Sequence, residues 1–161
     1  HRITAAEVAA KNPKAIILSG GPKSVHVEGA PTLDPAIYEL GIPILGICYG
    51  CQLVAQQLGG TVSRGGRGEY GRATLSRTET PSTLLGSNTP DVHDVWMSHF
   101  DFVSEAPAGF VTTASTLDAP HALIENDVRK IYGVQYHPEA GPGPHDSRYL
   151  FAQFAEMMEG K

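Results

Sequence analysis

The 161-residue sequence has few cysteines, little basic charge and no long hydrophobic run. Its two cysteines, Cys48 and Cys51, exclude a framework of several disulfides and favour a reducing, cytoplasmic setting. Lysine and arginine number 12 against 17 aspartates and glutamates, which gives a net charge of −5 and no basic cluster for nucleic acid. No apolar run approaches the ~20 residues that span a bilayer, and no signal peptide is visible. We therefore expect neither a membrane nor a nucleic acid as partner.

Hydrophobic residues make up 41% of the chain, enough for the core of one globular domain and too many for a disordered chain. No repeat, low-complexity tract or linker is visible, so we predict a single domain over residues 1–161. The chain begins at His1, and residues 3–12 predict a helix in which Thr4 and Glu7 have capping-box spacing. Because an α/β domain more often opens with a strand, we expect the first strand and helix of the fold to be missing.

The first third of the sequence alternates short apolar runs with helical patterns. Residues 15–18 and 44–47 are apolar runs bounded by turn residues, as is typical of buried strands. Asp34 and Pro35 predict the start of a short helix, and residues 49–58 have helical periodicity. This alternation predicts an α/β fold, with an open, mostly parallel sheet and flanking helices.

The middle of the chain predicts a small antiparallel strand region. Its strand candidates are residues 72–77, 95–97, 110–114 and 122–125. The loops between them are rich in proline, serine and threonine. Residues 131–136 predict a clearer strand, and Ser147 is expected to open a final helix.

The segment Gly46-Ile47-Cys48-Tyr49-Gly50 places a cysteine between two glycines where a strand turns into a helix. The glycines remove side chains that would collide in so tight a turn, and the turn directs the Cys48 sulfur outward. The helix behind it directs N–H groups and partial positive charge at that sulfur, which favours the reactive thiolate. The N–H of Tyr49 would be available to an oxyanion. The pattern favours a nucleophilic Cys48 over a merely buried cysteine.

Redox chemistry is a second interpretation, because Cys48 and Cys51 form a C-x-x-C motif. That motif does not require glycines around its first cysteine. Cys51 also shares a predicted helix face with Val54 and Leu58, which indicates a core thiol. A zinc site is disfavoured because no second cysteine pair or close histidine pair completes four ligands, so we expect no metal.

His137 follows the predicted strand at residues 131–136, at the carboxyl end where open α/β sheets build sites. A thiolate that cleaves an amide needs a proton donor for the departing nitrogen, and histidine suits that task. Glu139 is close enough to hydrogen-bond the ring and fix its tautomer. From these residues alone, a catalytic His137 and an ordinary surface or core histidine are about equally supported.

Three motifs in this order resemble the class I glutamine amidotransferases: SGGP at residues 19–22, GICYGCQ at 46–52 and HPE at 137–139. The resemblance covers nearly the whole chain. Within that family, the amidotransferase domains of GMP synthetases are most similar. The supporting stretches are ILSGGPKSV (17–25), GIPILGICYG (41–50), EYG (69–71), VWMSH (95–99) and GVQYHPE (133–139).

The resemblance implies a catalytic triad of Cys48, His137 and Glu139. The substrate-binding positions that it implies are Gly20, Gly21, Tyr49, Gln52, Ser98, His99 and Phe100. Among them, the backbone of Gly21 and Tyr49 would form the oxyanion hole. Gln52 and the backbone around His99 would hold the glutamine.

The resemblance also implies a reaction in which Cys48 attacks the side-chain amide of glutamine and His137 protonates the leaving ammonia. Water then releases glutamate from the thioester. The ammonia would pass to an ATP-pyrophosphatase (synthetase) domain or subunit that aminates XMP to GMP. Glutamine and that synthetase part are the expected partners. No cofactor is expected in this domain, and ATP and Mg are expected only in the synthetase part, which this chain lacks.

Departures from the family pattern keep two alternatives open. Phe100 stands where the family usually has glycine, and the family's first strand is expected to be missing. These departures leave a non-catalytic regulatory domain of the same fold as one alternative. Residues 138–150 look more like the small subunit of carbamoyl phosphate synthetase. An amidotransferase subunit of a carbamoyl-phosphate-synthetase-type enzyme is therefore the other alternative.

Overall fold

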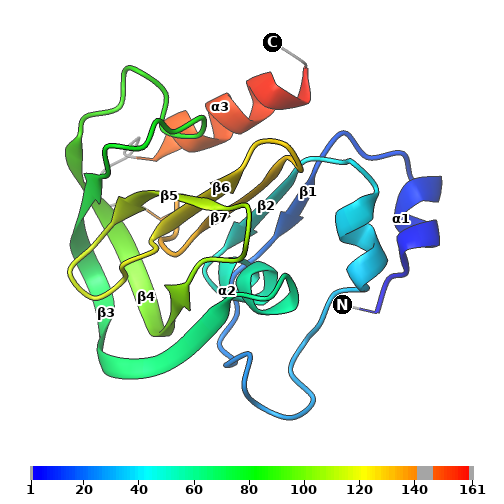
Figure 1. Cartoon of the computed structure of the whole chain (residues 1–161), viewed down its shortest axis with the longest axis horizontal. Coiled ribbons are helices and arrows are strands. Elements are labelled where there is room, and N and C mark those ends of the chain that lie inside the picture. The colour runs from blue at the N-terminus through cyan, green and yellow to red at the C-terminus, as the bar shows by residue number, and fades with distance from the viewer. Residues whose placement is uncertain (1, 141–146, 160–161) are drawn as a thin grey trace.

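Seven strands form one sheet in the order β1-β2-β7-β6-β5-β3-β4 in the computed structural model, which describes residues 2–140 and 147–159 (Figure 1). The strands are β1 (Ile16–Leu18), β2 (Ile44–Ile47), β3 (Thr61–Arg77), β4 (Val92–Glu105), β5 (Val111–Ser115), β6 (Leu123–Asn126) and β7 (Ile131–Val134). The helices are α1 (Ala5–Ala10), the 3-10 helix η1 (Pro35–Glu39), α2 (Tyr49–Gln57) and α3 (Arg148–Met158).

The sheet is mixed, and the predicted α/β fold is confirmed. Parallel pairing joins β1 to β2 and β2 to β7. The other pairs, β7 with β6, β6 with β5, β5 with β3 and β3 with β4, are antiparallel. The antiparallel strands continue the same sheet, and they include the long β3–β4 hairpin. The antiparallel share of the sheet is therefore larger than the sequence predicts.

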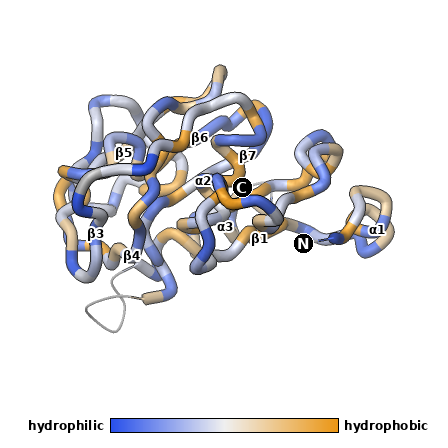
Figure 2. The backbone as a smooth tube through the Cα atoms, turned by 90° about the horizontal axis from the view of Figure 1, so that it is seen from below, coloured by the Kyte–Doolittle hydropathy of each residue, from blue (hydrophilic) through white to orange (hydrophobic). Residues whose placement is uncertain are grey.

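Two hydrophobic clusters lie on opposite faces of the sheet because successive strand residues point to opposite sides. On β2, Leu45 packs into the cluster that Leu150 and Phe154 of α3 cover. Ile44 packs into the other cluster, with Val54 of α2. Figure 2 shows the apolar residues gathered where β7 and α2 meet in the middle of the molecule.

The short helices start as the sequence predicts. The Thr4 hydroxyl accepts a hydrogen bond from the Glu7 N–H, and the Glu7 carboxylate accepts one from the Thr4 N–H at 2.8 Å, which completes the capping box. Asp34 caps η1 with Pro35 at its first position, although this segment is a 3-10 helix. Ser147 precedes α3 but makes no side-chain cap. Among the described residues, no helix is long and apolar enough to cross a membrane.

Strand β1 lies at one edge of the sheet, and Ile17 at its centre is 52% exposed. A groove of about 670 Å³ runs beside it, between α1, η1 and the start of α2. Its apolar lining includes Val8, Ile16, Leu33, Ile37 and Leu53.

Candidate active site

Cys48 forms the turn between β2 and α2 and has φ 50° and ψ −105°, a strained conformation for a residue with a side chain. A Cβ atom on Gly46 would lie 2.6 Å from the Gly50 backbone. One on Gly50 would collide with the Leu18 carbonyl of β1. The Cys48 N–H donates to the Val134 carbonyl of β7 at 2.8 Å, which ties the turn to the neighbouring strand. The glycines therefore have the steric role that the sequence predicts.

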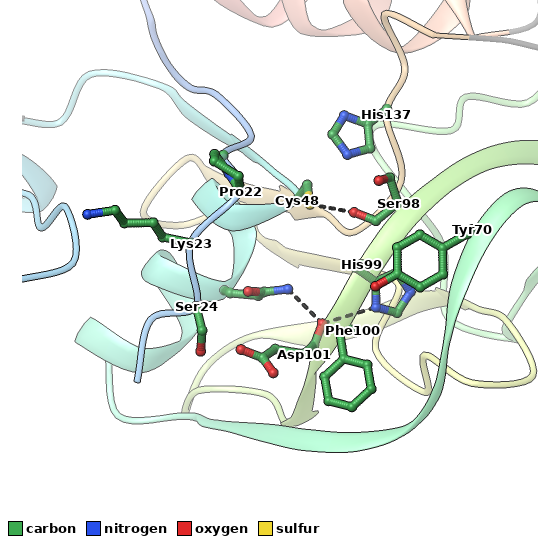
Figure 3. A pocket seen from close by; sticks show the side chains of 12 residues that line it. Pro22, Lys23, Ser24, Cys48, Tyr70, Ser98, His99, Phe100, Asp101 and His137 are labelled. Carbon is green, nitrogen blue, oxygen red and sulfur yellow. Dashed lines mark hydrogen bonds between the residues drawn. The ribbon is translucent and has the colours of Figure 1, made fainter. Parts of the chain in front are cut away.

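The carboxyl ends of three adjacent parallel strands converge on this turn. Gly20 and Gly21 follow β1, Cys48 follows β2, and His137 comes three residues after β7. A Cβ atom on Gly20 would lie 2.9 Å from His137 Cε1 and 3.6 Å from Cys48 Cβ, so both side chains flank this glycine. Figure 3 shows the His137 ring beside Cys48. The strand order thus assembles residues that are far apart in sequence.

Hydrogen bonds orient His137 from two sides. Its backbone N–H donates to the Trp96 carbonyl of β4 at 2.8 Å. Its ring Nδ1 lies 2.8 Å from Glu139 Oε1, and because the carboxylate accepts, this nitrogen carries the hydrogen. The other nitrogen, Nε2, is buried and makes no hydrogen bond of ordinary geometry with the described residues. It is therefore the ring atom left to exchange a proton with Cys48.

The pKa of His137 is raised to about 9. The largest cause is its interaction with the Cys48 sulfur, and the hydrogen bond to Glu139 and the charges of both partners add to it. Burial acts in the opposite direction. The ring is consequently a cation at neutral pH and can donate a proton.

The two cysteines have different surroundings, and both are free thiols. Cys48 Sγ lies 3.5 Å from the Ser98 carbonyl oxygen, in the wall of a cavity. Cys51 is fully buried, and burial raises the pKa of its thiol well above the ordinary value. Its sulfur packs against Gly133 of β7, where a Cβ atom would lie 2.7 Å away. The core position predicted for Cys51 is therefore confirmed.

A cavity of about 470 Å³ opens beside Cys48 and His137 (Figure 3). Seven of the residues identified from the sequence line it: Gly21, Cys48, Gln52, Ser98, His99, Phe100 and His137. Three others, Gly20, Glu139 and Tyr49, do not line it. Gly20 lies against both Cys48 and His137, and Glu139 contacts Nδ1 of the His137 ring. The Tyr49 hydroxyl donates to the Pro31 carbonyl at 2.6 Å, so only the backbone of Tyr49 lies at the Cys48 turn.

Gln52 is buried, and its amide nitrogen already has protein partners. Nε2 donates to the Asp101 carbonyl at 2.7 Å and to Gln135 Oε1 at 3.2 Å. The side chain therefore braces the cavity wall formed by β4, in addition to lining the cavity.

Phe100 leaves the space beside Cys48 clear. Its ring points away from Cys48 and His137 (Figure 3) and is 48% exposed. The β3–β4 register passes from Arg64 opposite Asp101 to Glu69 opposite His99, so residues 65–68 of β3 stand opposite Phe100 alone. This bulge interrupts the regular β3–β4 pairing at Phe100. Phe100 also borders a second cavity, of about 320 Å³, which neither Cys48 nor His137 lines.

Asp101, Tyr70 and Ser24 also line the main cavity, and none of the sequence motifs gives them a role. Asp101 is only 7% exposed. Residues 95, 97, 99, 101 and 103 alternate as buried positions along β4. That period of two, extended beyond Met97, was the available signal that Asp101 faces inward.

Comparison with known proteins gives consistent matches. The family model described as "Glutamine amidotransferase class-I" matches residues 1–157. The GMP synthase [glutamine-hydrolyzing] of Streptomyces avermitilis is 55% identical over 145 residues, which cover 90% of this chain and 27% of that protein. The corresponding protein of Nocardia farcinica is 49% identical over 160 residues, covering 99% of this chain and 30% of that protein.

Among solved structures, a Thermoplasma acidophilum protein assigned to GMP synthase as one of its subunits superposes with a TM-score of 0.77 at 25% identity. The match covers 97% of this chain and 77% of that one. The curated relatives are much longer than the sequence, which spans less than a third of their length.

Proposed function

Because the chain belongs to the class I glutamine amidotransferase family, we propose that it hydrolyses glutamine to glutamate and ammonia with Cys48 as the nucleophile. The observation that carries this proposal is the turn at Cys48, which has a positive φ and lies beside an imidazole oriented by Glu139. A strained turn of this kind persists where the surrounding structure over-determines it, and such turns concentrate at active sites.

In the proposed reaction, the Cys48 thiolate attacks the side-chain carbonyl carbon of glutamine. The resulting oxyanion accepts hydrogen bonds from the backbone N–H groups of Gly21 and Tyr49. His137 donates its Nε2 proton to the amide nitrogen as the carbon–nitrogen bond breaks, and ammonia leaves. Water, deprotonated by His137, then attacks the thioester carbon, so that glutamate leaves and the Cys48 sulfur is restored.

The charge of His137 supports its role as the acid in the first step. The raised pKa keeps the ring protonated at neutral pH, and the Glu139 contact holds Nε2 toward Cys48. When the ring has given up that proton to ammonia, it can accept one from water. One histidine therefore serves both steps.

Asp101 is our candidate for the substrate's α-ammonium group. Its carboxylate lines the same cavity as Cys48 and is largely buried. A carboxylate held away from water attracts an ammonium group more strongly than one on the surface does. The cavity walls at Ser98–Asp101 would hold the rest of the glutamine through backbone groups.

We further propose that the ammonia is delivered to an ATP-pyrophosphatase (synthetase) domain or subunit, for amination of XMP to GMP. The support is that the curated relatives matched over most of this chain are GMP synthases. ATP and Mg would belong to that synthetase part. The stretch 138–150 that suggested a carbamoyl-phosphate-synthetase-type enzyme lies partly outside the described residues.

The test is glutamine hydrolysis by the chain, measured as ammonia and glutamate released in equal amounts. We expect Cys48→Ser to abolish release and Cys51→Ser, the matched control in the same helix, to retain it. Iodoacetamide should alkylate Cys48 and leave Cys51 unmodified, because Cys51 is fully buried with a raised pKa. Activity that survives Cys48→Ser, or no release from the unchanged chain, would contradict the proposal.

A further inference from the structure

A buried chain of hydrogen bonds runs from β3 to the wall of the main cavity. The Glu69 carboxylate lies 2.8 Å from His99 Nε2, and His99 Nδ1 lies 3.0 Å from the Asp101 carbonyl oxygen. Both side chains are shielded from water, since that of His99 is 1% exposed and that of Glu69 is 9% exposed. These hydrogen bonds therefore lie in the protein interior, where polar groups must be paired.

The partners of His99 determine where its hydrogens lie. The Asp101 carbonyl can only accept, so Nδ1 carries a hydrogen. The Nε2 atom faces a carboxylate oxygen, so a second proton lies between Nε2 and Glu69 Oε2. Such charge-assisted hydrogen bonds are among the stronger ones in proteins. Without Glu69, Nε2 would have no acceptor among the described residues, and the ring would lose one of the two hydrogen bonds that orient it.

Glu69 is itself held in place by the neighbouring strand. Thr116 Oγ1 accepts a hydrogen bond from the Ala119 N–H and donates one to Glu69 Oε2 at 2.8 Å. Glu69 also stands directly opposite His99 in the β3–β4 register, immediately after the bulge. The carboxylate is thus fixed by its own strand and by the turn after β5.

The series of hydrogen bonds from Glu69 ends at the Asp101 carbonyl. This carbonyl accepts from His99 Nδ1 and also from Gln52 Nε2 of α2. The bulge leaves Phe100 without a partner on β3, between the paired residues His99 and Asp101. At this irregular point the two side-chain hydrogen bonds to the Asp101 carbonyl add to the strand pairing. They help to position the segment Ser98–Asp101, which lines the cavity.

We propose that Glu69 is a positioning residue for the glutamine site, acting through the His99 imidazole on the backbone of Ser98–Asp101. The role rests on the proposed function in that the ligand of this wall is taken to be glutamine. Glu69 touches neither Cys48 nor His137 in this scheme. Its loss should weaken glutamine binding and leave the nucleophile intact.

The test compares Glu69→Ala and Glu69→Gln with the unchanged chain in steady-state glutamine hydrolysis. We expect the KM for glutamine to rise roughly tenfold in Glu69→Ala, the size of effect that loss of one buried charged hydrogen bond gives. The rise should be smaller in Glu69→Gln, because an amide can still hydrogen-bond the ring. The rate of Cys48 alkylation by iodoacetamide should stay within roughly twofold of that in the unchanged chain, because the reagent does not bind to this wall.

Glu125→Gln is the matched control, because Glu125 is another buried glutamate on the same sheet, 1% exposed. It accepts hydrogen bonds from Thr83 and Thr113 and lies outside the cavity. We expect this variant to lower stability to denaturant without changing KM. An unchanged KM in Glu69→Ala would overturn the proposal. So would an equal rise in KM and an equal fall in alkylation rate in Glu69→Ala and Glu125→Gln.

Glutamine binding to the Cys48→Ser chain, measured by calorimetry, separates this inference from the proposed function. Adding Glu69→Ala to that chain should raise the Kd for glutamine roughly tenfold. A rise in Kd supports the positioning role even where hydrolysis fails. An unchanged Kd overturns that role even where the chain is an active glutaminase.

Discussion

Gly20 and Gly21 are neighbours in sequence with very different surroundings. A methyl group on Gly20 would press on the His137 ring, 2.9 Å from Cε1. One on Gly21 would meet nothing closer than the Tyr49 side chain at 3.9 Å, which is an ordinary contact. Only the first glycine is therefore required by the packing of Cys48 and His137.

We predict that Gly20→Ala lowers kcat/KM for glutamine roughly tenfold or more, because displacement of the His137 ring disturbs proton transfer. Gly21→Ala should stay within roughly threefold of the unchanged chain, since its backbone N–H is retained. Steady-state hydrolysis by the two variants checks this. Equal losses in both would show that the surroundings of the glycines do not control activity.

The charge of His137 gives a second prediction at the residue scale. Titration of its ring followed by NMR should give a pKa of about 9. Cys48→Ser should lower that pKa most, because interaction with the cysteine is the largest cause of the rise, and Glu139→Gln should lower it as well. An unaltered pKa in Cys48→Ser would contradict the contact between the two side chains.

The same shift sets the pH dependence of stability. The folded pKa of His137 lies above the ordinary value of 6.5, so the folded state binds its proton more tightly than the unfolded state does. The stabilisation is complete below pH 6.5 and disappears as the pH rises through about 9. The difference in denaturation midpoint between the unchanged chain and His137→Gln should therefore shrink across that range.

At the scale of elements, α2 and β7 approach closely because one of them offers a glycine. Cys51 of α2 lies over Gly133 of β7, where a Cβ atom would be 2.7 Å from the sulfur and 3.1 Å from Ile124 Cγ1. This contact also fixes the distance between α2, which follows Cys48, and β7, the strand that leads to His137.

We predict that Gly133→Ala destabilises the fold by about 1–3 kcal/mol, the usual cost of overpacking a core. Combining it with Cys51→Ala should cost less than the sum of the two single changes, because the smaller residue removes the closest clash. Urea denaturation of the three variants measures the coupling. Strictly additive losses would mean that the two residues do not press on each other.

The sequence predicts the elements whose signals are local. The capping box at Thr4, the buried run at residues 44–47 and the helical face at residues 49–58 all correspond to observed elements. Strands β3 and β4 extend well beyond the predicted residues 72–77 and 95–97. Residues 61–71 are rich in glycine and lack alternation, so pairing with β4, which is distant in sequence, decides their conformation.

The residues of the candidate site also differ in whether a local sequence pattern identifies them. Cys48 and His137 are recognisable because each belongs to a short motif at the end of a strand. The contact of Glu69 with His99 is set by a bulged register that no local pattern encodes. Phe100 likewise becomes interpretable only in the structure, where it stands opposite the bulge with its ring turned away from Cys48 and His137.

At the scale of the whole molecule, the strand order accounts for the position of the site. Strands β1, β2 and β7 are neighbours and parallel, so the residues that follow their carboxyl ends meet at one edge. The antiparallel strands extend the sheet on one side only and bring the β4 wall across the cavity. The parallel part carries Cys48 and His137, the proposed nucleophile and acid, and the antiparallel part carries the proposed binding wall.

The open side of β1 has a practical consequence for handling the protein. An edge strand carrying an exposed isoleucine presents unpaired peptide groups, and such edges recruit other chains into aggregates. We predict concentration-dependent self-association in sedimentation experiments. Ile17→Lys should reduce it, because a charge on an edge strand opposes pairing, and Leu117→Lys, at a 95% exposed position, should not. Identical sedimentation of the unchanged chain, Ile17→Lys and Leu117→Lys would show that the edge of β1 does not drive self-association.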